Sequence, residues 1–145
     1  MFRHLVIPTD GSDLATAAVD RGVELAAQIG ARITFVTVIE HFHLIAYSPA
    51  QIAESVEAYN ADTAKRAAEI LAGAEAKARA AGVEASSLVR RSDHPYVEIS
   101  AAADEVGADL IVISSHGRRG VTAMVLGSQT SKLLSTTTRP VLVIR

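Results

Sequence analysis

Three short runs of uninterrupted apolar residues most constrain how this chain can fold. They are Leu-Val-Ile within 4–9, Ile-Val-Ile within 109–115 and Val-Leu-Val-Ile within 140–145. A strand with one solvent-exposed face alternates apolar and polar residues, whereas a parallel strand covered by helices on both faces is apolar throughout. We therefore expect these segments to lie in a central parallel sheet.

The rest of the chain alternates between strand and helix patterns. Further strands are predicted at 32–39 and 85–91, and helices at 13–29, about 49–81, 96–106 and about 128–135. Right-handed crossovers place such helices on both faces of one sheet. The sequence thus predicts one α/β domain over residues 1–145, a doubly wound five-stranded parallel sheet with strand order 3-2-1-4-5.

The first predicted helix carries an apolar face, and Gly30 follows it as a helix-ending glycine would. We expect the residues of this face to pack on the sheet: Leu14, Ala17, Ala18, Gly22, Leu25 and Ile29.

The expected strand order also predicts where a ligand binds. Between the first and fourth strands the connections leave in opposite directions and open a crevice at the carboxyl ends. The loop after the first strand is PTDGSD (8–13), and the loop after the fourth begins SSHGRRG (114–120). These two loops should therefore meet in one crevice.

The glycines of the second loop are suited to an anion. Gly117 and Gly120 allow a ligand to approach the backbone closely, and Gly127 precedes a predicted helix whose first N–H groups lack acceptors. The helix dipole favours an anion at that end. Further donors would be the side chains of Ser128, Thr130, Arg118 and Arg119. The alternative is a turn that glycine permits, with the arginines in solvent.

Composition and motifs exclude several classes of protein. No Gly-Lys-Ser/Thr is present, and a single glycine follows the first strand, so neither a Walker A loop nor a dinucleotide fingerprint is present. A net charge of −2 and 4% aromatic residues disfavour nucleic-acid and membrane partners. The chain has no cysteine, and its apolar runs are too short for a signal-peptide core or a membrane span. We expect a cytoplasmic protein.

The chain resembles the universal stress protein family over its whole length. The resemblance rests on VIPTDGS (6–12), VTVIE (36–40), DLIVISSHGRRGVTAMVLGSQTSKLL (109–134) and RPVLVIR (139–145). Nucleotide-binding members carry the motif G-x2-G-x9-G-[ST]. Here Ser114 replaces the first glycine, Gly117 is the second, and Gly127 with Ser128 closes the motif. Ser114 is a departure that adds a side chain beside the expected ligand path.

The resemblance implies the Rossmann-like fold of the adenine nucleotide alpha hydrolases and a site for ATP, ADP or AMP, with or without magnesium. It implies that Pro8, Thr9 and Asp10 line the adenosine side and that Val38 packs on adenine. It implies that Ile113, Ser114 and Gly117 border the ribose and α-phosphate. It assigns the phosphates to Gly127, Ser128, Gln129 and Thr130, with Arg118 within reach.

Simpler roles remain open for several of these side chains. Asp10 could cap the first helix or form an Asx-turn, and Val38 could be a core residue. Ser115 and His116 should point to opposite faces of an extended strand, which argues against a catalytic pair. His41 and His43 could hold a metal if the second strand continued, but a solvated loop is favoured.

The predicted function is that of a small signalling or regulatory module of the stress-response type. The resemblance implies a homodimer formed through the strand at 140–145, which lies at the sheet edge and needs a cover. We also expect an unidentified protein partner. The alternatives are a dimeric interaction protein that binds no nucleotide and, at most, a slow ATP hydrolase, because Asp10 is the carboxylate that these loops offer.

Overall fold

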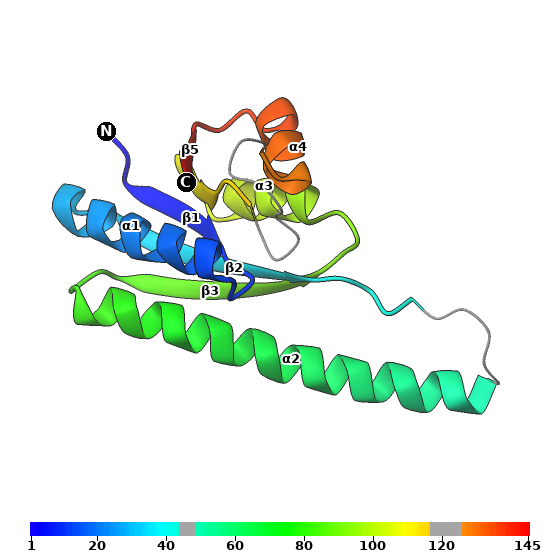
Figure 1. Cartoon of the computed structure of the whole chain (residues 1–145). Helices are drawn as coiled ribbons and strands as arrows, with labels where there is room; N and C mark the ends of the chain where they lie inside the picture. Colours follow the sequence, from blue (N-terminus) through cyan, green and yellow to red (C-terminus); the bar gives the residue numbers. More distant parts are fainter. Residues whose placement is uncertain (44–48, 117–125) are drawn as a thin grey trace.

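The computed structural model describes residues 1–43, 49–116 and 126–145. Its strands and helices alternate along the chain (Figure 1). The strands are β1 (His4–Pro8), β2 (Arg32–Ile39), β3 (Ala85–Arg91), β4 (Leu110–Ser114) and β5 (Val141–Ile144). The helices are α1 (Asp13–Ile29), α2 (Pro49–Ala80), α3 (Pro95–Glu105) and α4 (Ser128–Thr136). Within the described ranges no helix is both long and apolar enough to cross a membrane.

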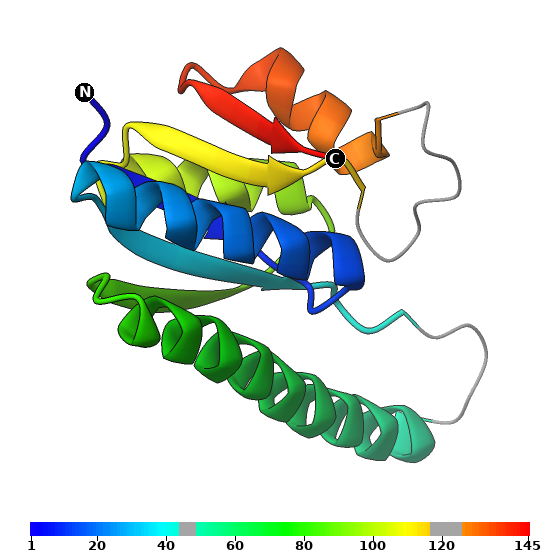
Figure 2. The same cartoon turned by 60° about the vertical axis from the view of Figure 1, so that its left-hand side comes forward.

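The five strands form one parallel sheet in the order β3-β2-β1-β4-β5. Figure 2 shows β3 and β5 at its two edges. The central strands β1 and β4 are buried at every position, whereas β3 and β5 are only partly covered. The predicted fold and strand order are confirmed. The apolar runs predicted the central strands correctly because a strand buried on both faces needs an uninterrupted apolar sequence.

Two layers of helices cover the sheet. One core cluster joins Phe35 and its neighbours on the sheet to α1 and α2, and a second joins Val6 and Val36 to α3 and α4. Their helix residues are Val19, Val23, Ala26, Leu71, Ala74 and Ala78 in the first cluster, and Ile99, Ala102, Ala103 and Leu133 in the second.

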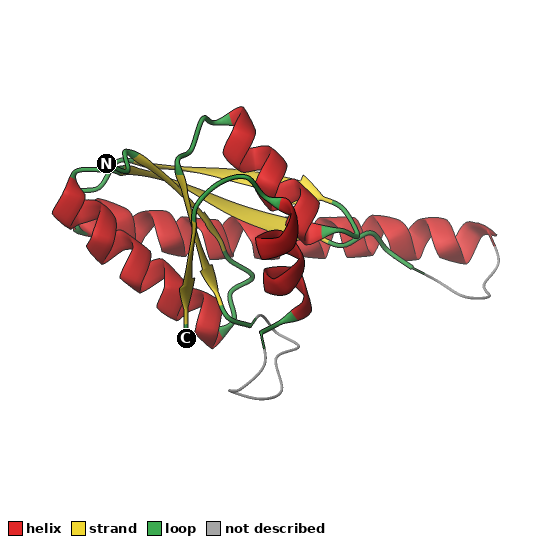
Figure 3. Ribbon diagram, turned by 90° about the horizontal axis from the view of Figure 1, so that it is seen from above, coloured by secondary structure: helices red, strands yellow, loops and turns green. Residues whose placement is uncertain are grey.

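Helix α2 is longer than the sheet that it covers. Its buried residues, from Ala67 to Ala78, lie in its C-terminal half, and its N-terminal half projects past the sheet (Figure 3). There the Tyr59 hydroxyl donates to the Glu40 carbonyl over 2.8 Å, and its ring lies 5.0 Å from that of Phe42. The projecting half is thus held by the chain that leaves β2.

The predicted face of α1 was only partly right: Ala18 and Gly22 are buried and Leu25 packs on the core, but both ends of the predicted face are not buried. Leu14 and Ile29 are 39% and 37% exposed. The buried residues are Ala15, Ala18, Val19, Gly22, Val23 and Ala26. The smaller side chains face the sheet because α1 approaches it closely at Gly22, where even a Cβ atom would collide with Ile7.

Candidate functional site

The loop after β1 is held by the neighbouring strand. Pro8 ends β1 and is buried. The Thr9 N–H donates to the Val36 carbonyl over 2.9 Å, and the Thr9 carbonyl accepts from the Thr37 hydroxyl over 2.8 Å. Thr9 and Thr37 are both nearly buried. The backbone at 8–9 therefore forms a fixed wall at the carboxyl end of the sheet.

Of the two local roles expected of Asp10, it forms the Asx-turn, and Ser12 caps the helix instead. The Asp10 carboxylate accepts from the Ser12 N–H over 2.9 Å, which is an Asx-turn. Ser12 caps α1, since its hydroxyl oxygen accepts from the Ala15 N–H over 3.2 Å. The turn at Asp10 is confirmed and capping by Asp10 is not. A serine directly before a helical pattern is the signal that would have identified the cap.

Gly11 brings α2 against the same loop. Its φ is +76°, and a Cβ atom there would lie 2.9 Å from Ile70 Cγ1. Only glycine satisfies both the positive φ and the close approach.

The N-terminus of α4 is fixed to the carboxyl end of β4. The Gly127 N–H donates to the Ser115 carbonyl over 2.8 Å. The first hydrogen bond of the helix runs from the Ser131 N–H to the Gly127 carbonyl over 2.9 Å. The N–H groups of 128–130 therefore have no acceptor within the helix. Because β4 lies beside β1, these N–H groups lie at the switch-point edge of the sheet.

Gly127 is required here for space and not for its dihedral angles. Its φ is −59°, which any residue can adopt. A Cβ atom at this position would lie 3.1 Å from the Ser115 carbonyl oxygen and 3.3 Å from His116 Cα. A side chain would therefore push the start of α4 away from β4.

Two side chains in the first turn of α4 are used within the protein. Thr130 is 3% exposed, and its hydroxyl donates to the Ser114 carbonyl over 2.9 Å. Gln129 Oε1 accepts from the Tyr96 N–H at the start of α3, over 3.2 Å. Ser128 is exposed. The expected free hydroxyl is thus found at Ser128 but not at Thr130.

The side chains of Ser115 and His116 are hydrogen-bonded to each other, although they were expected to point to opposite faces of an extended strand. Ser115 Oγ and His116 Nδ1 lie 3.1 Å apart, and both residues are nearly buried. The expectation was wrong because β4 ends at Ser114, so the two residues lie beyond the extended backbone that would separate their side chains.

Val38 and Ile113 lie on the same side of the sheet. Both contact the cluster that α3 and α4 cover, Ile113 nearly buried and Val38 only partly. Val38 thus packs on the core, as one of its two expected roles required, and part of its side chain remains exposed. Gly117, Arg118, Arg119 and Gly120 lie outside the described residues.

Both histidines after β2 bond to one carboxylate, His43 through its side chain and His41 through its backbone. His43 Nε2 lies 2.9 Å from Asp93 Oδ1, which also accepts from the His41 N–H over 3.0 Å. The hydrogen bond from His43 lowers the pKa of Asp93. Across the described part of the chain, no three His, Cys, Asp or Glu side chains are placed to hold a metal ion.

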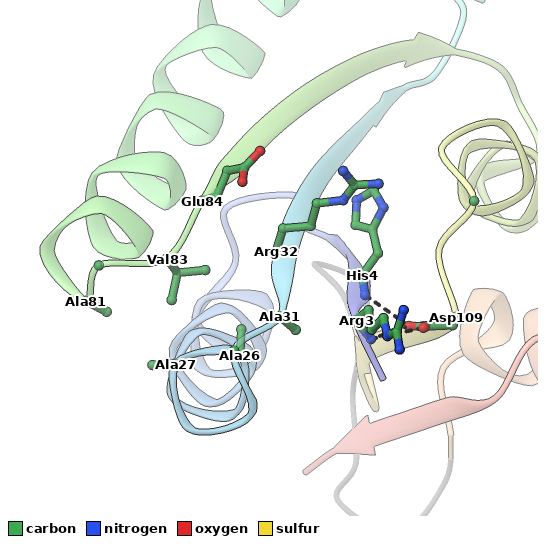
Figure 4. A pocket seen from close by; sticks show the side chains of 13 residues that line it. Arg3, His4, Ala26, Ala27, Ala31, Arg32, Ala81, Val83, Glu84 and Asp109 are labelled. Atoms are coloured by element: carbon green, nitrogen blue, oxygen red, sulfur yellow. Dashed lines mark hydrogen bonds between the residues drawn. The ribbon is translucent and has the colours of Figure 1, made fainter. Parts of the chain in front are cut away.

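A hollow of about 670 Å³ lies at the opposite edge of the sheet, at the amino end of β1 (Figure 4). Asp109 there accepts from the N–H groups of Arg3 and His4 over 2.9–3.0 Å. Burial and then the charge of Arg32 lower the pKa of His4, whose Nε2 lies 2.8 Å from the Thr34 hydroxyl. These bonds fasten β1 to its two neighbours, which is a structural role.

A doubly wound α/β domain with a helix N-terminus at the switch point of its sheet is an arrangement found in many phosphate-binding proteins. The family model of the Universal stress protein family matches residues 1–145. The chain belongs to this family.

Individual relatives agree with this assignment. The chain is 31% identical to universal stress protein YxiE of Bacillus subtilis, and the match covers 100% of both chains. It is 28% identical to a universal stress protein solved in complex with cAMP, covering 99% of this chain and 97% of that one with a TM-score of 0.68. Protein MJ0577 of Methanocaldococcus jannaschii matches in fold, with a TM-score of 0.86 at 21% identity over 99% and 96% of the two chains.

Proposed function

We propose that this protein binds an adenine nucleotide, ATP, ADP or AMP, with its phosphates at the N-terminus of α4. The observation that carries the proposal is the hydrogen bond from the Gly127 N–H to the Ser115 carbonyl. This bond holds the first turn of α4 at the carboxyl edge of β4, beside the loop after β1. Helix N–H groups without acceptors, at the positive end of the helix dipole, favour a phosphate.

The remaining contacts follow from the walls of the crevice. Pro8, Thr9 and Asp10 would line the adenosine side, and Val38 would use its partly exposed surface against the base. Ile113 would lie beneath the ribose. The backbone N–H groups of Ser128, Gln129 and Thr130 would hold the phosphates, with the exposed Ser128 hydroxyl as a further donor, and Gly117 and Arg118 belong to the same proposal. The relative solved with cAMP supports a nucleotide as the ligand.

The first prediction concerns the purified protein itself. Calorimetric titration with ATP, ADP and AMP, after denaturation and refolding to release any bound nucleotide, should give one site per chain for at least one of them. Repeating it with and without magnesium tests whether the metal takes part. Absence of binding at millimolar nucleotide would contradict the proposal and favour an interaction protein that uses no nucleotide.

We further propose that the protein acts as a homodimeric regulatory module that pairs through 140–145. Strand β5 lies at the sheet edge with β4 on one side, and an uncovered edge invites pairing with another chain. Leu142, in the middle of β5, is 39% exposed. Nucleotide occupancy would then be communicated to a protein partner through the dimer.

The second prediction is that the protein sediments as a dimer at micromolar concentration and that Leu142→Lys makes it a monomer. The two added charges would face each other across the paired edges, where like charges oppose pairing. Val89→Lys is the matched control, because Val89 lies on the other edge strand and is 44% exposed; this variant should stay dimeric. A monomeric wild type would contradict the proposal, as would a monomeric Val89→Lys variant.

A further inference from the structure

Ser114, which stands in the place of the motif's first glycine, directs its hydroxyl to the protein's own backbone. It is the last residue of β4, is 6% exposed, and pairs with Ile144 in the sheet. Its hydroxyl donates to the carbonyl of His116, two residues ahead, over 2.7 Å. The hydroxyl proton is therefore bonded to the backbone at His116, just after β4.

That bond is part of a buried set of hydrogen bonds, which we name the Ser114 cluster: Ser114, Ser115, His116, Gly127 and Thr130. The Ser114 carbonyl accepts from the Thr130 hydroxyl, and the Ser115 carbonyl accepts from the Gly127 N–H. Ser115 Oγ and His116 Nδ1 form a further bond. The side-chain members Ser114, Ser115, His116 and Thr130 are each at most 8% exposed.

The cluster joins the end of β4 to the first turn of α4 at several points. Two consecutive carbonyls, of Ser114 and Ser115, accept from α4 and from the residue before it. The Ser114 hydroxyl donates to the carbonyl of His116, which follows these two in the chain. A glycine at 114 would provide no such donor and would leave the backbone more freedom.

We infer that Ser114 is a positioning residue that fixes the backbone at 115–116, directly after β4, and thereby the N-terminus of α4. It does not obstruct the crevice, because its side chain is bonded to the protein's own backbone. The effect on nucleotide affinity rests on the proposed function, whereas the effect on the position of α4 does not.

Amide hydrogen exchange of the ligand-free protein tests the positioning role directly. In Ser114→Ala the Gly127 amide should exchange roughly three- to tenfold faster, the loss expected for one hydrogen bond. The Ile111 amide, bonded to the Pro140 carbonyl within the sheet, should be unaffected. Ser135→Ala is the matched control, because it removes a hydroxyl at the other end of α4, and it should leave the Gly127 amide unchanged. Unchanged Gly127 exchange in Ser114→Ala, or equal acceleration at Ile111, would overturn the inference.

Nucleotide titration of Ser114→Gly gives a second test, because a positioning role and an obstructing role predict different changes in affinity. If Ser114 positions α4, this variant, which restores the motif's glycine, binds no more tightly than the wild type. If the side chain obstructs the ligand, the variant binds more tightly, and the inference is wrong. Failure of the wild type to bind any adenine nucleotide would reject the proposed function, while the exchange experiment would still decide the role of Ser114.

Discussion

Gly127→Glu is expected to abolish adenine nucleotide binding, with affinity falling more than about 100-fold. The substitution places a carboxylate at the start of α4, where the proposed phosphates lie, and a like charge at such a contact costs several kcal/mol. Its Cβ atom would also lie 3.1 Å from the Ser115 carbonyl oxygen. Titration calorimetry with the nucleotide that the wild type prefers measures the loss.

Two further variants separate charge from bulk. Gly127→Ala adds only the Cβ atom and should weaken binding by about tenfold, because the neighbouring backbone must move. Gly73 lies within α2 with nothing within 4 Å of a Cβ atom there, so Gly73→Glu and Gly73→Ala are matched controls that should leave the affinity unchanged. Wild-type affinity in Gly127→Glu would place the phosphates elsewhere.

Gly22→Ala is expected to lower the free energy of unfolding by about 2 kcal/mol, although alanine is the better helix former. The new methyl group would collide with Ile7 Cδ1 and would lie 3.7 Å from Val112 Cγ1. Ile7 and Val112 are both fully buried, so α1 must move away from the sheet. Urea denaturation gives the loss, and Gly73→Ala, the same change on an open helix surface, should instead gain up to about 1 kcal/mol.

A double-mutant cycle tests the cause of that loss. Ile7→Val removes the Cδ1 methyl that the new Cβ would meet, at a cost of about 0.5–1.5 kcal/mol by itself. The double variant Ile7→Val with Gly22→Ala should therefore be more stable than the two separate losses added together predict. Simple additivity would show that the collision with Ile7 is not what destabilises Gly22→Ala.

The strand order on which the proposed site rests was predictable, but the hydrogen bonds of its side chains were not. The loops at 8–13 and after Ser114 were expected to meet because strand order fixes the switch point. Thr130 was expected to hold phosphate through its hydroxyl, yet that hydroxyl donates to the Ser114 carbonyl. The Gln129 side chain is likewise used within the protein, by the Tyr96 N–H. Such bonds join residues 16 and 33 positions apart, so no local pattern announces them.

The secondary-structure elements and their parallel order in the sheet follow from local patterns in the amino-acid sequence. The runs Leu-Val-Ile and Ile-Val-Ile indicated strands buried on both faces, and alternation with helices indicated parallel order, because hydrophobic periodicity is a local property of the chain. Three features could be seen only in the folded protein: which face of α1 is buried, how Ser115 and His116 are oriented, and that the Ser114 hydroxyl bonds within the protein. Those outcomes depend on the distance between packed elements and on where β4 ends, and both are set by contacts between residues remote in sequence.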